Sequence, residues 1–241
     1  MSVEREKNHF LSAVTLSLGF ALAGYFVSQT LYNSKVALNT ADVKGLAERR
    51  VEADTAYWSI GYSVAGAQHA AIPQLYDQSE RDQQKIIGLL EKNGIDKSEV
   101  NLGVIDYQRR EFRDENQKLV EERHVLIGSI EIQTNKVKLV SEVRSKLNQL
   151  IAQGLDIQNN APSYHFTRLN DIKPAMLKEA TKNARLAANE FASNAGVKVG
   201  GIRSARQGGF VIRDVGESYG DTRKIDKDIR VVTNVTFFLT D

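Results

Sequence analysis

The sequence predicts an α+β fold, a largely antiparallel sheet with helices on one face, preceded by one N-terminal transmembrane helix. Three observations support this prediction. Residues 10–32 contain no charge, several later segments alternate apolar and polar residues, and three others repeat apolar residues at helical spacing. In chain order the part after residue 32 is expected to run β-α-β-β-α-β-α-β-β.

The composition excludes several classes of site. The 241 residues include 32 Lys and Arg against 30 Asp and Glu, and a net charge of +2 gives no field typical of nucleic-acid binding. The chain has no cysteine, which excludes disulfides, thiolate catalysis and cysteine-ligated zinc or iron–sulfur centres. One folded domain and one membrane segment is the simplest organisation for this length.

Residues 10–32, FLSAVTLSLGFALAGYFVSQTLY, predict a retained membrane anchor. As a helix that rises about 1.5 Å per residue they extend roughly 34 Å, enough to cross a hydrocarbon core of about 30 Å. A cleavable signal is the alternative, because Ala21-Leu22-Ala23 matches an A-x-A cleavage pattern. The apolar run continues past this pattern to Tyr32, which favours the anchor.

Basic residues predict the orientation of the anchor. Arg5 and Lys7 precede the apolar run, the first basic residue after it is Lys35, and such a bias favours a cytoplasmic N-terminus. The bilayer of the inner (cytoplasmic) membrane is then the partner of the anchor. The expected divisions are a cytoplasmic tail at 1–9, the anchor at 10–32, a linker at 33–42 and a periplasmic domain at 43–241.

The first strand and helix of the domain have clear periodicities. Strict alternation over residues 54–65 predicts a long strand with one buried side, and Trp58 is in register with that side, which favours a core role over ligand stacking. Residues 71–92 predict a helix. Ser79 and Gln83 interrupt its apolar stripe, so we expect it to cover the sheet loosely at these positions.

Two further strands are expected around residues 100–104 and 126–132. Most positions between them, in the segment 108–123 (QRREFRDENQKLVEER), are charged and of mixed sign. Such a segment cannot bury enough apolar surface to order itself in a core. It is therefore expected to form either a solvated hairpin extension or a flexible loop.

The remaining elements are expected from caps, glycines and alternation. A helix capped by Asn135 precedes a short strand at 163–169, and another helix follows with Asn170 or Asp171 as its cap and Pro174 in its first turn. That last helix has a mostly small apolar stripe that can approach a sheet closely: Leu177, Ala180, Ala184, Ala187, Ala188, Phe191 and Ala195. A strand from residue 202, an irregular stretch at 207–228 and a final strand at 229–239 complete the chain.

The block MLKEATKNARLAANEFASNAGVKVGGI resembles the most recognisable part of the SIMPL domain family, where an Ala-rich helix ends in a Gly-x-x-x-Gly turn and a strand. The turn glycines here are Gly196 and Gly200. VKGLAERRVEADTAYWSIGYSV is similar to the opening strand pair of the family, and LLEKNGIDKSEVNLGVIDY to its helix end, Gly-Ile turn and second strand. The resemblance spans residues 43–239.

This resemblance implies a bacterial envelope protein, periplasmic or membrane-attached, with no agreed catalytic site. For some relatives it implies a link to oxidative-stress tolerance, a role as a surface antigen, or a ring-shaped homo-oligomer.

Residue types used in catalysis and metal binding form no recognisable pattern in the sequence. His9, His69, His124 and His165 are scattered and lack a second ligand at helical spacing. The glycine pairs at 200–201 and 208–209 lack the Lys and Ser/Thr of a phosphate loop, and no G-x-S-x-G motif is present. We therefore assign no catalytic, metal or cofactor-binding residue and expect no cofactor.

Charged residues are expected to be solvated. The sequence places no two carboxylates together in a cleft, as a catalytic pair requires. A solvated loop is the simplest interpretation for four acidic residues of the 108–123 segment: Asp114, Glu115, Glu121 and Glu122. The last forty residues have a basic tilt: Arg203, Arg206, Arg213, Arg223, Lys224 and Arg230. Aromatic residues among them are sparse, which favours a solvated face or subunit contact over a nucleic-acid partner.

Two functions follow as expectations. The preferred one is a non-enzymatic, membrane-anchored envelope protein whose SIMPL-like domain self-associates into a ring or channel-like homo-oligomer, with the stress link that the resemblance implies. The alternative is a periplasmic ligand-binding or enzymatic domain with a cleft beside the 108–123 and 207–228 loops, because loops on a rigid scaffold often carry function.

Overall fold

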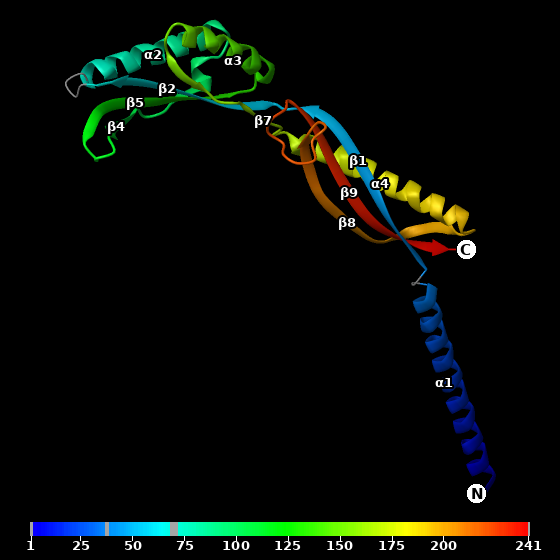
Figure 1. Cartoon of the computed structure of the whole chain (residues 1–241). Coiled ribbons are helices and arrows are strands. Elements are labelled where there is room, and N and C mark those ends of the chain that lie inside the picture. The colour runs from blue at the N-terminus through cyan, green and yellow to red at the C-terminus, as the bar shows by residue number, and fades with distance from the viewer. Residues whose placement is uncertain (1, 37–38, 68–71, 241) are drawn as a thin grey trace. The chain divides into compact units, whose positions relative to one another are not determined.

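The computed structural model describes residues 2–36, 39–67 and 72–240. These residues form four α-helices, nine strands and one short 3-10 helix, η2 (Lys97–Glu99). Figure 1 shows their order along the chain. The predicted α+β class with antiparallel strands is confirmed, but the strands form two sheets where the sequence analysis expected one.

The chain divides into two compact units. The first consists of residues 1–47, 174–210 and 231–241, and the second of residues 48–173 and 211–230. The boundaries fall inside β1 (Thr40–Glu52), α4 (Leu169–Asn194), β8 (Lys198–Asp214) and β9 (Asp226–Thr240).

A six-stranded sheet forms the body of the second unit, in the order β3-β5-β2-β6. Its centre is the antiparallel pair β2 (Thr55–Gly66) and β5 (Leu119–Thr134), which stays in register from Ala56 opposite Thr134 to Gly66 opposite His124. The shorter strands β3 (Val100–Leu102) and β4 (Asp106–Arg113) pair with β5, and β6 (Asp156–Asn159) and β7 (Ser163–His165) pair with β2. The sequence analysis missed β6.

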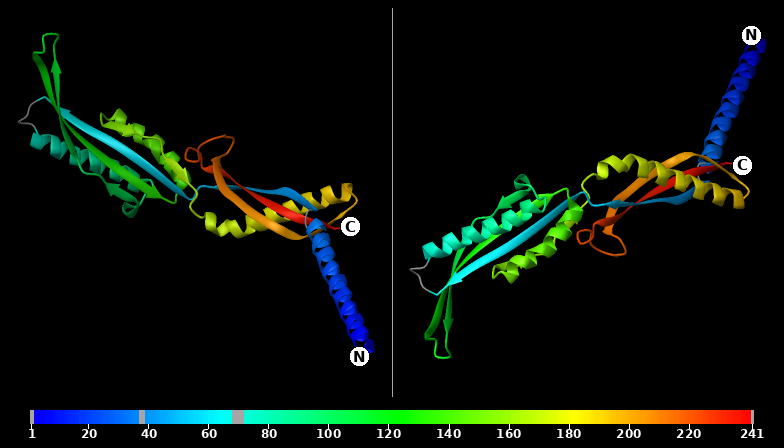
Figure 2. Two further views of the ribbon diagram at one scale, coloured as in Figure 1. Left: turned by 90° about the horizontal axis from the view of Figure 1, so that it is seen from below. Right: turned by 90° about the horizontal axis from the view of Figure 1, so that it is seen from above.

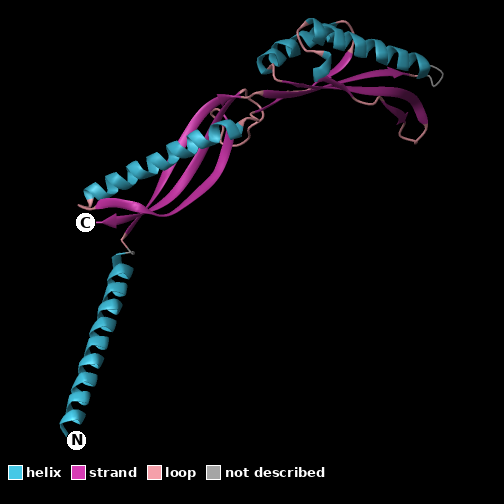
Figure 3. Ribbon diagram, turned by 180° about the vertical axis from the view of Figure 1, so that it is seen from behind, coloured by secondary structure: helices cyan, strands magenta, loops and turns pink. Residues whose placement is uncertain are grey.

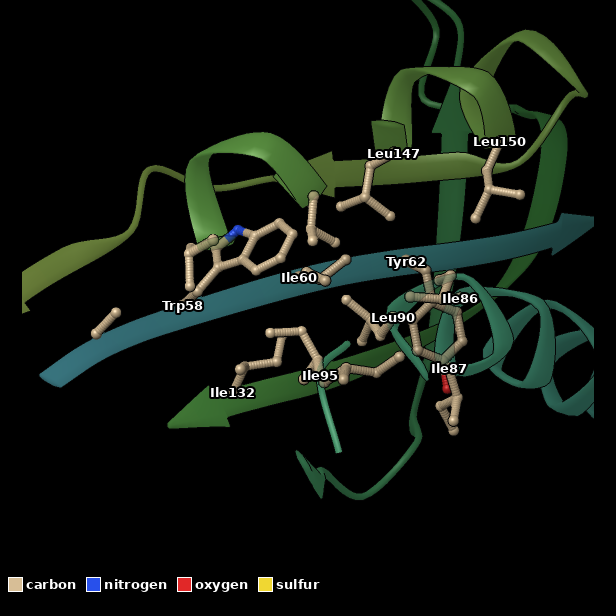
Figure 4. Packing of buried hydrophobic residues seen from close by; sticks show 14 of the residues in the cluster. Trp58, Ile60, Tyr62, Ile86, Ile87, Leu90, Ile95, Ile132, Leu147 and Leu150 are labelled. Carbon is tan, nitrogen blue, oxygen red and sulfur yellow. The ribbon is translucent and has the colours of Figure 1, made fainter. Parts of the chain in front are cut away.

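Two helices, α2 (Ile72–Lys92) and α3 (Val137–Ala152), lie side by side on one face of this sheet (Figure 2). Between helices and sheet lies a continuous apolar core, part of which Figure 4 shows. Trp58 is 2% exposed within it, and its Nε1 donates a hydrogen bond to the carbonyl of Asn160 at 3.0 Å. The expected core role of Trp58 is confirmed, because the indole is buried and its one donor is satisfied.

The polar stretch of α2 packs more closely than the sequence analysis expected. Ser79 is fully buried, and Nε2 of Gln83 donates a hydrogen bond to the hydroxyl of Tyr62 at 2.8 Å. Gly128 lies opposite Tyr62, where an added Cβ would come within 2.2 Å of the tyrosine ring. The expected loose cover is therefore wrong, because the Tyr62 hydroxyl on β2 supplies a partner for Gln83 and Ser79 is small enough to pack in the buried interface.

The charged segment 108–123 is an exposed hairpin made of β4 and the first part of β5. At its tip the Asp114 carboxylate accepts hydrogen bonds from the backbone N–H groups of Asn116 and Lys118, both at 2.9 Å. Of the two forms that the sequence left open, the structure shows the hairpin extension, with an irregularity in register between Phe112 and Arg113.

The second sheet has the order β1-β9-β8, and α4 lies along one of its faces (Figure 3). α4 buries one residue per turn, every fourth position: Met176, Ala180, Ala184, Ala188 and Ala192. An added Cβ at Gly45 of β1 would lie 1.8 Å from the carbonyl oxygen of Ala180, so strand and helix are as close as a glycine permits.

The buried stripe of α4 is narrower than the sequence analysis expected. Ala187, Ala195 and Phe191 are exposed, and Leu177 is half-buried. A straight i, i+4 row of small residues is enough to cover this sheet, so neighbouring apolar positions on the helix remain outside the contact.

Several expected boundaries also differ. α4 begins at Leu169 with Pro174 inside it, and β7 ends at His165. The expected caps Asn170 and Asp171 are wrong, because the helix begins before them and both lie inside it. Ahead of the helix, the Asp54 carboxylate accepts the Thr167 N–H at 3.0 Å, a tertiary contact that sequence spacing does not reveal.

Three more corrections concern caps and loops. The N-cap of α3 is Lys136, and the predicted cap Asn135 precedes it. The stretch 207–228 was expected to be irregular, but its residues 207–214 continue β8. Gly208 lies close to β9 there, since an added Cβ would be 2.7 Å from the Val232 carbonyl oxygen. The expected linker 33–42 is shorter in the structure, because α1 (Ser2–Val36) extends into it and β1 begins at Thr40. Residues 37–38 lie outside the described part, and so does residue 71, where the sequence analysis expected α2 to begin.

Candidate functional site

The N-terminal helix α1 contains a segment, Ala13–Tyr32, that is long and apolar enough to cross a membrane. The side chains described in this segment are exposed. Its hydroxyl groups at Ser17 and Thr30 donate hydrogen bonds to the carbonyls of Ala13 and Phe26 one turn earlier, so they are satisfied within the helix. By its length and composition the segment fits a membrane anchor or a signal sequence.

The strand β8 is an edge strand of the three-stranded sheet, since it has β9 on one side and no strand on the other in the part of the chain that the structure describes. Residues 201–207 of β8 are all exposed, and Ile202 is 49% exposed. An exposed edge presents unpaired backbone N–H and C=O groups that can pair with another strand. The basic residues Arg203 and Arg206, predicted as a solvated face or subunit contact, lie on this edge strand.

A charged hollow of about 520 Å³ lies in the second unit, beside the turn between β8 and β9. Arg50 makes two hydrogen bonds to the Asp228 carboxylate, at 2.9 and 3.3 Å, and Arg230 lies 3.5 Å from Glu48. Arg213 also lines the hollow. The hollow therefore combines arginines and carboxylates on one exposed surface, next to the 207–228 segment that the alternative function requires.

A buried ion pair, Lys227 with Asp214, connects the two strands on either side of this turn. Nζ of Lys227 lies 2.6 Å from Oδ1 of Asp214, and it also donates to the Asp221 carbonyl at 2.6 Å. Oδ2 of Asp214 accepts the N–H of Arg223 at 2.9 Å. Burial favours the neutral acid, but hydrogen bonds from Lys227 and backbone N–H groups outweigh it and lower the pKa of Asp214.

Sequence reasoning missed this pair, although a signal was present. Lys227 stands two residues before Ile229, the first of the alternating apolar residues of β9, so strict alternation places the lysine on the buried side. A lysine in a buried row requires a partner. Its partner lies in the 207–228 stretch, which was expected to be irregular.

The histidines remain scattered. His124 is buried, with Nδ1 2.8 Å from the Tyr107 hydroxyl and Nε2 3.3 Å from Glu122, and His165 lies edge-on against Tyr57. His69 and the side chain of His9 lie outside the described part. Within the described residues, no group of three or more His, Asp and Glu side chains could hold a metal ion.

The four acidic residues that the sequence analysis singled out in the hairpin do not converge on a cleft. Asp114 holds the hairpin turn, Glu121 pairs with Arg123 at 2.5 Å, and Glu122 pairs with His124. Glu115 is exposed near the tip of the hairpin. The structure therefore places three of these carboxylates in local contacts along one hairpin.

Comparison with known families gives one match. Residues 41–237 match SIMPL, described as a protein of unknown function (DUF541). No curated protein matches the sequence. The matched range begins with β1 and ends within β9, so it contains both sheets and all the helices described after α1.

Proposed function

Because the chain belongs to the SIMPL family, we propose that it is a non-enzymatic envelope protein, anchored by α1, whose SIMPL domain self-associates into a homo-oligomer. The observation that supports this most is the long exposed edge of β8. We place the domain in the periplasm, with the N-terminus in the cytoplasm, on the distribution of basic residues around the apolar run.

Retention of α1 as an anchor is supported by what cleavage would leave behind. The A-x-A pattern lies inside the helix, and a cut after Ala23 would leave an apolar N-terminal segment that includes Phe26, 64% exposed, and Tyr32, 69% exposed. Exposed apolar surface of this kind is typical of membrane contact. A retained anchor also confines the copies to a plane, which raises their effective concentration.

The sheet geometry supports a ring or channel-like assembly. The two edges of the three-stranded sheet are β1 and β8, and they are different surfaces. When β8 of one copy meets β1 of the next, the contact is head-to-tail, and repeated head-to-tail contacts close into a ring when the rotation allows. We include a link to envelope or oxidative-stress tolerance in this proposal, and its only support is the family resemblance.

A pair of matched variants tests the edge. Ile202→Lys places a charge on the β8 edge, whereas Leu186→Lys places the same charge on the exposed side of α4, where the leucine is 55% exposed. With the full-length protein in detergent, light scattering is expected to show a lower mass for Ile202→Lys and an unchanged mass for Leu186→Lys. Equal masses for both variants and the wild type would contradict assembly through β8.

The charged hollow supports the alternative, a ligand-binding or enzymatic domain. Its ion pairs are exposed and individually weak, so an anionic ligand can bind the arginines at low cost. Calorimetry with pyrophosphate as probe tests this function. Saturable binding that Arg213→Gln abolishes and Arg203→Gln leaves intact would favour it over a purely structural role.

A further inference from the structure

We propose that the open face of the six-stranded sheet carries a binding site for a neutral saccharide, centred on Tyr57. The site is a hollow of about 380 Å³ within the second unit, on the face opposite α2 and α3. This volume lies in the range of small-molecule sites, which are concave and have a few convergent polar groups.

Strand register builds the site. Asn101 of β3 lies opposite Glu131 of β5, and Glu131 lies opposite Ser59 of β2. The adjacent row runs from Gln133 of β5 to Tyr57 of β2 and on to Ser163 of β7. Because alternate residues of a strand share a face, these two rows of three side chains lie next to each other on the side of the sheet away from Trp58.

The polar side chains of these rows are available to a ligand. In the part of the chain that the structure describes, Ser59, Asn101, Glu131 and Gln133 make no side-chain hydrogen bond or ion pair. The strand backbones pair with one another, so the ladder does not need these side chains. Two amides, a carboxylate and a hydroxyl offer both donors and acceptors, which is what a ligand with several hydroxyl groups requires.

Tyr57 provides an aromatic platform in the same hollow. Its side chain is 42% exposed, and the His165 ring meets it edge-on, with centroids 5.3 Å apart and planes at 82°. This contact restrains the ring, so little conformational entropy is lost when a ligand binds against it. The C–H face of a pyranose ring can stack on such an aromatic face while its hydroxyl groups reach the surrounding amides.

The charge of the hollow selects against other ligands. Glu131 is the only acidic residue in its lining, and the lining contains no Lys or Arg. A site without a cation disfavours phosphorylated ligands and nucleic acid. A polyhydroxylated ligand without negative charge therefore fits the hollow best.

The test uses full-length protein in nanodiscs, because sugar-headed detergents would compete. Saturation-transfer NMR and calorimetry with cellotetraose and with N-acetylchitotetraose are expected to show saturable binding. Tyr57→Ala should weaken it by about tenfold or more, the loss of a stacked aromatic contact. Tyr76→Ala is the matched control, since Tyr76 is 39% exposed on α2, away from this face.

Gln133→Ala is the second variant, because an exposed amide can be truncated without disturbing the core, and it should also weaken binding. The far-UV spectrum verifies the fold of each variant. The inference is overturned if neither saccharide binds saturably, if Tyr57→Ala and Tyr76→Ala lose affinity equally, or if tetralysine binds more tightly than both saccharides through Glu131.

Discussion

The ammonium group of Lys227 lies 2.6 Å from the carboxylate of Asp214, and neither side chain is exposed to solvent. The pair joins the end of β8 to the start of β9. Lys227 also donates a hydrogen bond to the carbonyl of Asp221, which ties the segment between the two strands to the same side chain. Asp214 also lines the charged hollow, so the buried ion pair holds one wall of that hollow in place.

Removal of one partner is expected to be costly. Lys227→Met leaves a buried carboxylate without its counter-ion, and such changes cost about 3–5 kcal/mol of unfolding free energy. Urea unfolding of the variant measures this loss. Lys224→Met is the control, since Lys224 pairs with Glu217 at the surface and is expected to matter by about 0–1 kcal/mol. Equal losses in the two variants would show that the buried pair has no special role.

Stability is expected to fall in acid. Burial opposes the charged forms of Asp54 and Asp214, but hydrogen bonds outweigh burial, so the pKa of each is lowered from its ordinary value of 3.8. A carboxylate with a lowered folded-state pKa stabilises the fold fully above its unfolded-state pKa. That stabilisation is lost as the pH falls from about 4 through the lower folded-state values.

Urea midpoints measured between neutral pH and pH 2.5 test this dependence. Asp54→Asn should lower stability at neutral pH and flatten the acid decline, because Asp54 holds the N–H groups of Thr167 and Arg168 ahead of α4. An acid decline as steep in Asp54→Asn as in the wild type would exclude Asp54 as a source of it.

Close contact between β1 and α4 makes Gly45 intolerant of a side chain. An added Cβ would lie 1.8 Å from the Ala180 carbonyl and 2.6 Å from the Ala184 nitrogen, so Gly45→Ala must push strand and helix apart. We expect a loss of about 1–3 kcal/mol, as for other overpacked sites. Gly201→Ala on β8 is the matched control, because nothing lies within 4 Å of its added Cβ. Thermal melting that ranks the two variants equally would contradict this contact.

The hairpin between β4 and β5 is expected to add little to stability. Residues 109–120 are exposed, and their ion pairs, such as Arg113 with Glu111 at 2.6 Å, are at the surface. Replacement of residues 110–123 by Asn-Gly should therefore keep the melting temperature within a few degrees of the wild type. A collapse of the fold would show that the hairpin is part of the core architecture.

The sequence predicted elements well where a strand or helix has one strongly apolar side. β2, with Trp58 and Ile60 buried, is such a case, and so is α3 with its buried valines and leucines. β1 was expected only through the family resemblance. Its buried positions include Ala41, Gly45 and Ala47, which are small because α4 lies so close, and small residues give little alternation in hydropathy.

Features that depend on distant residues were not predictable from local pattern. The carboxylate that accepts the Thr167 N–H ahead of α4 comes from Asp54, more than a hundred residues earlier, and the counter-ion of Lys227 comes from another strand. The rows around Tyr57 exist only because four strands pair in one register. The alternation in β2 that places Trp58 in the core also places Tyr57 on the opposite face. It does not predict which residues of the other strands lie beside Tyr57.

Native mass spectrometry of the full-length protein, extracted from membranes, tests the central proposal most directly. We expect a complex whose mass is an integral multiple of the 26.8 kDa chain, which means that α1 is retained and the copies are assembled. A single chain, or subunits shortened by the loss of α1, would contradict it.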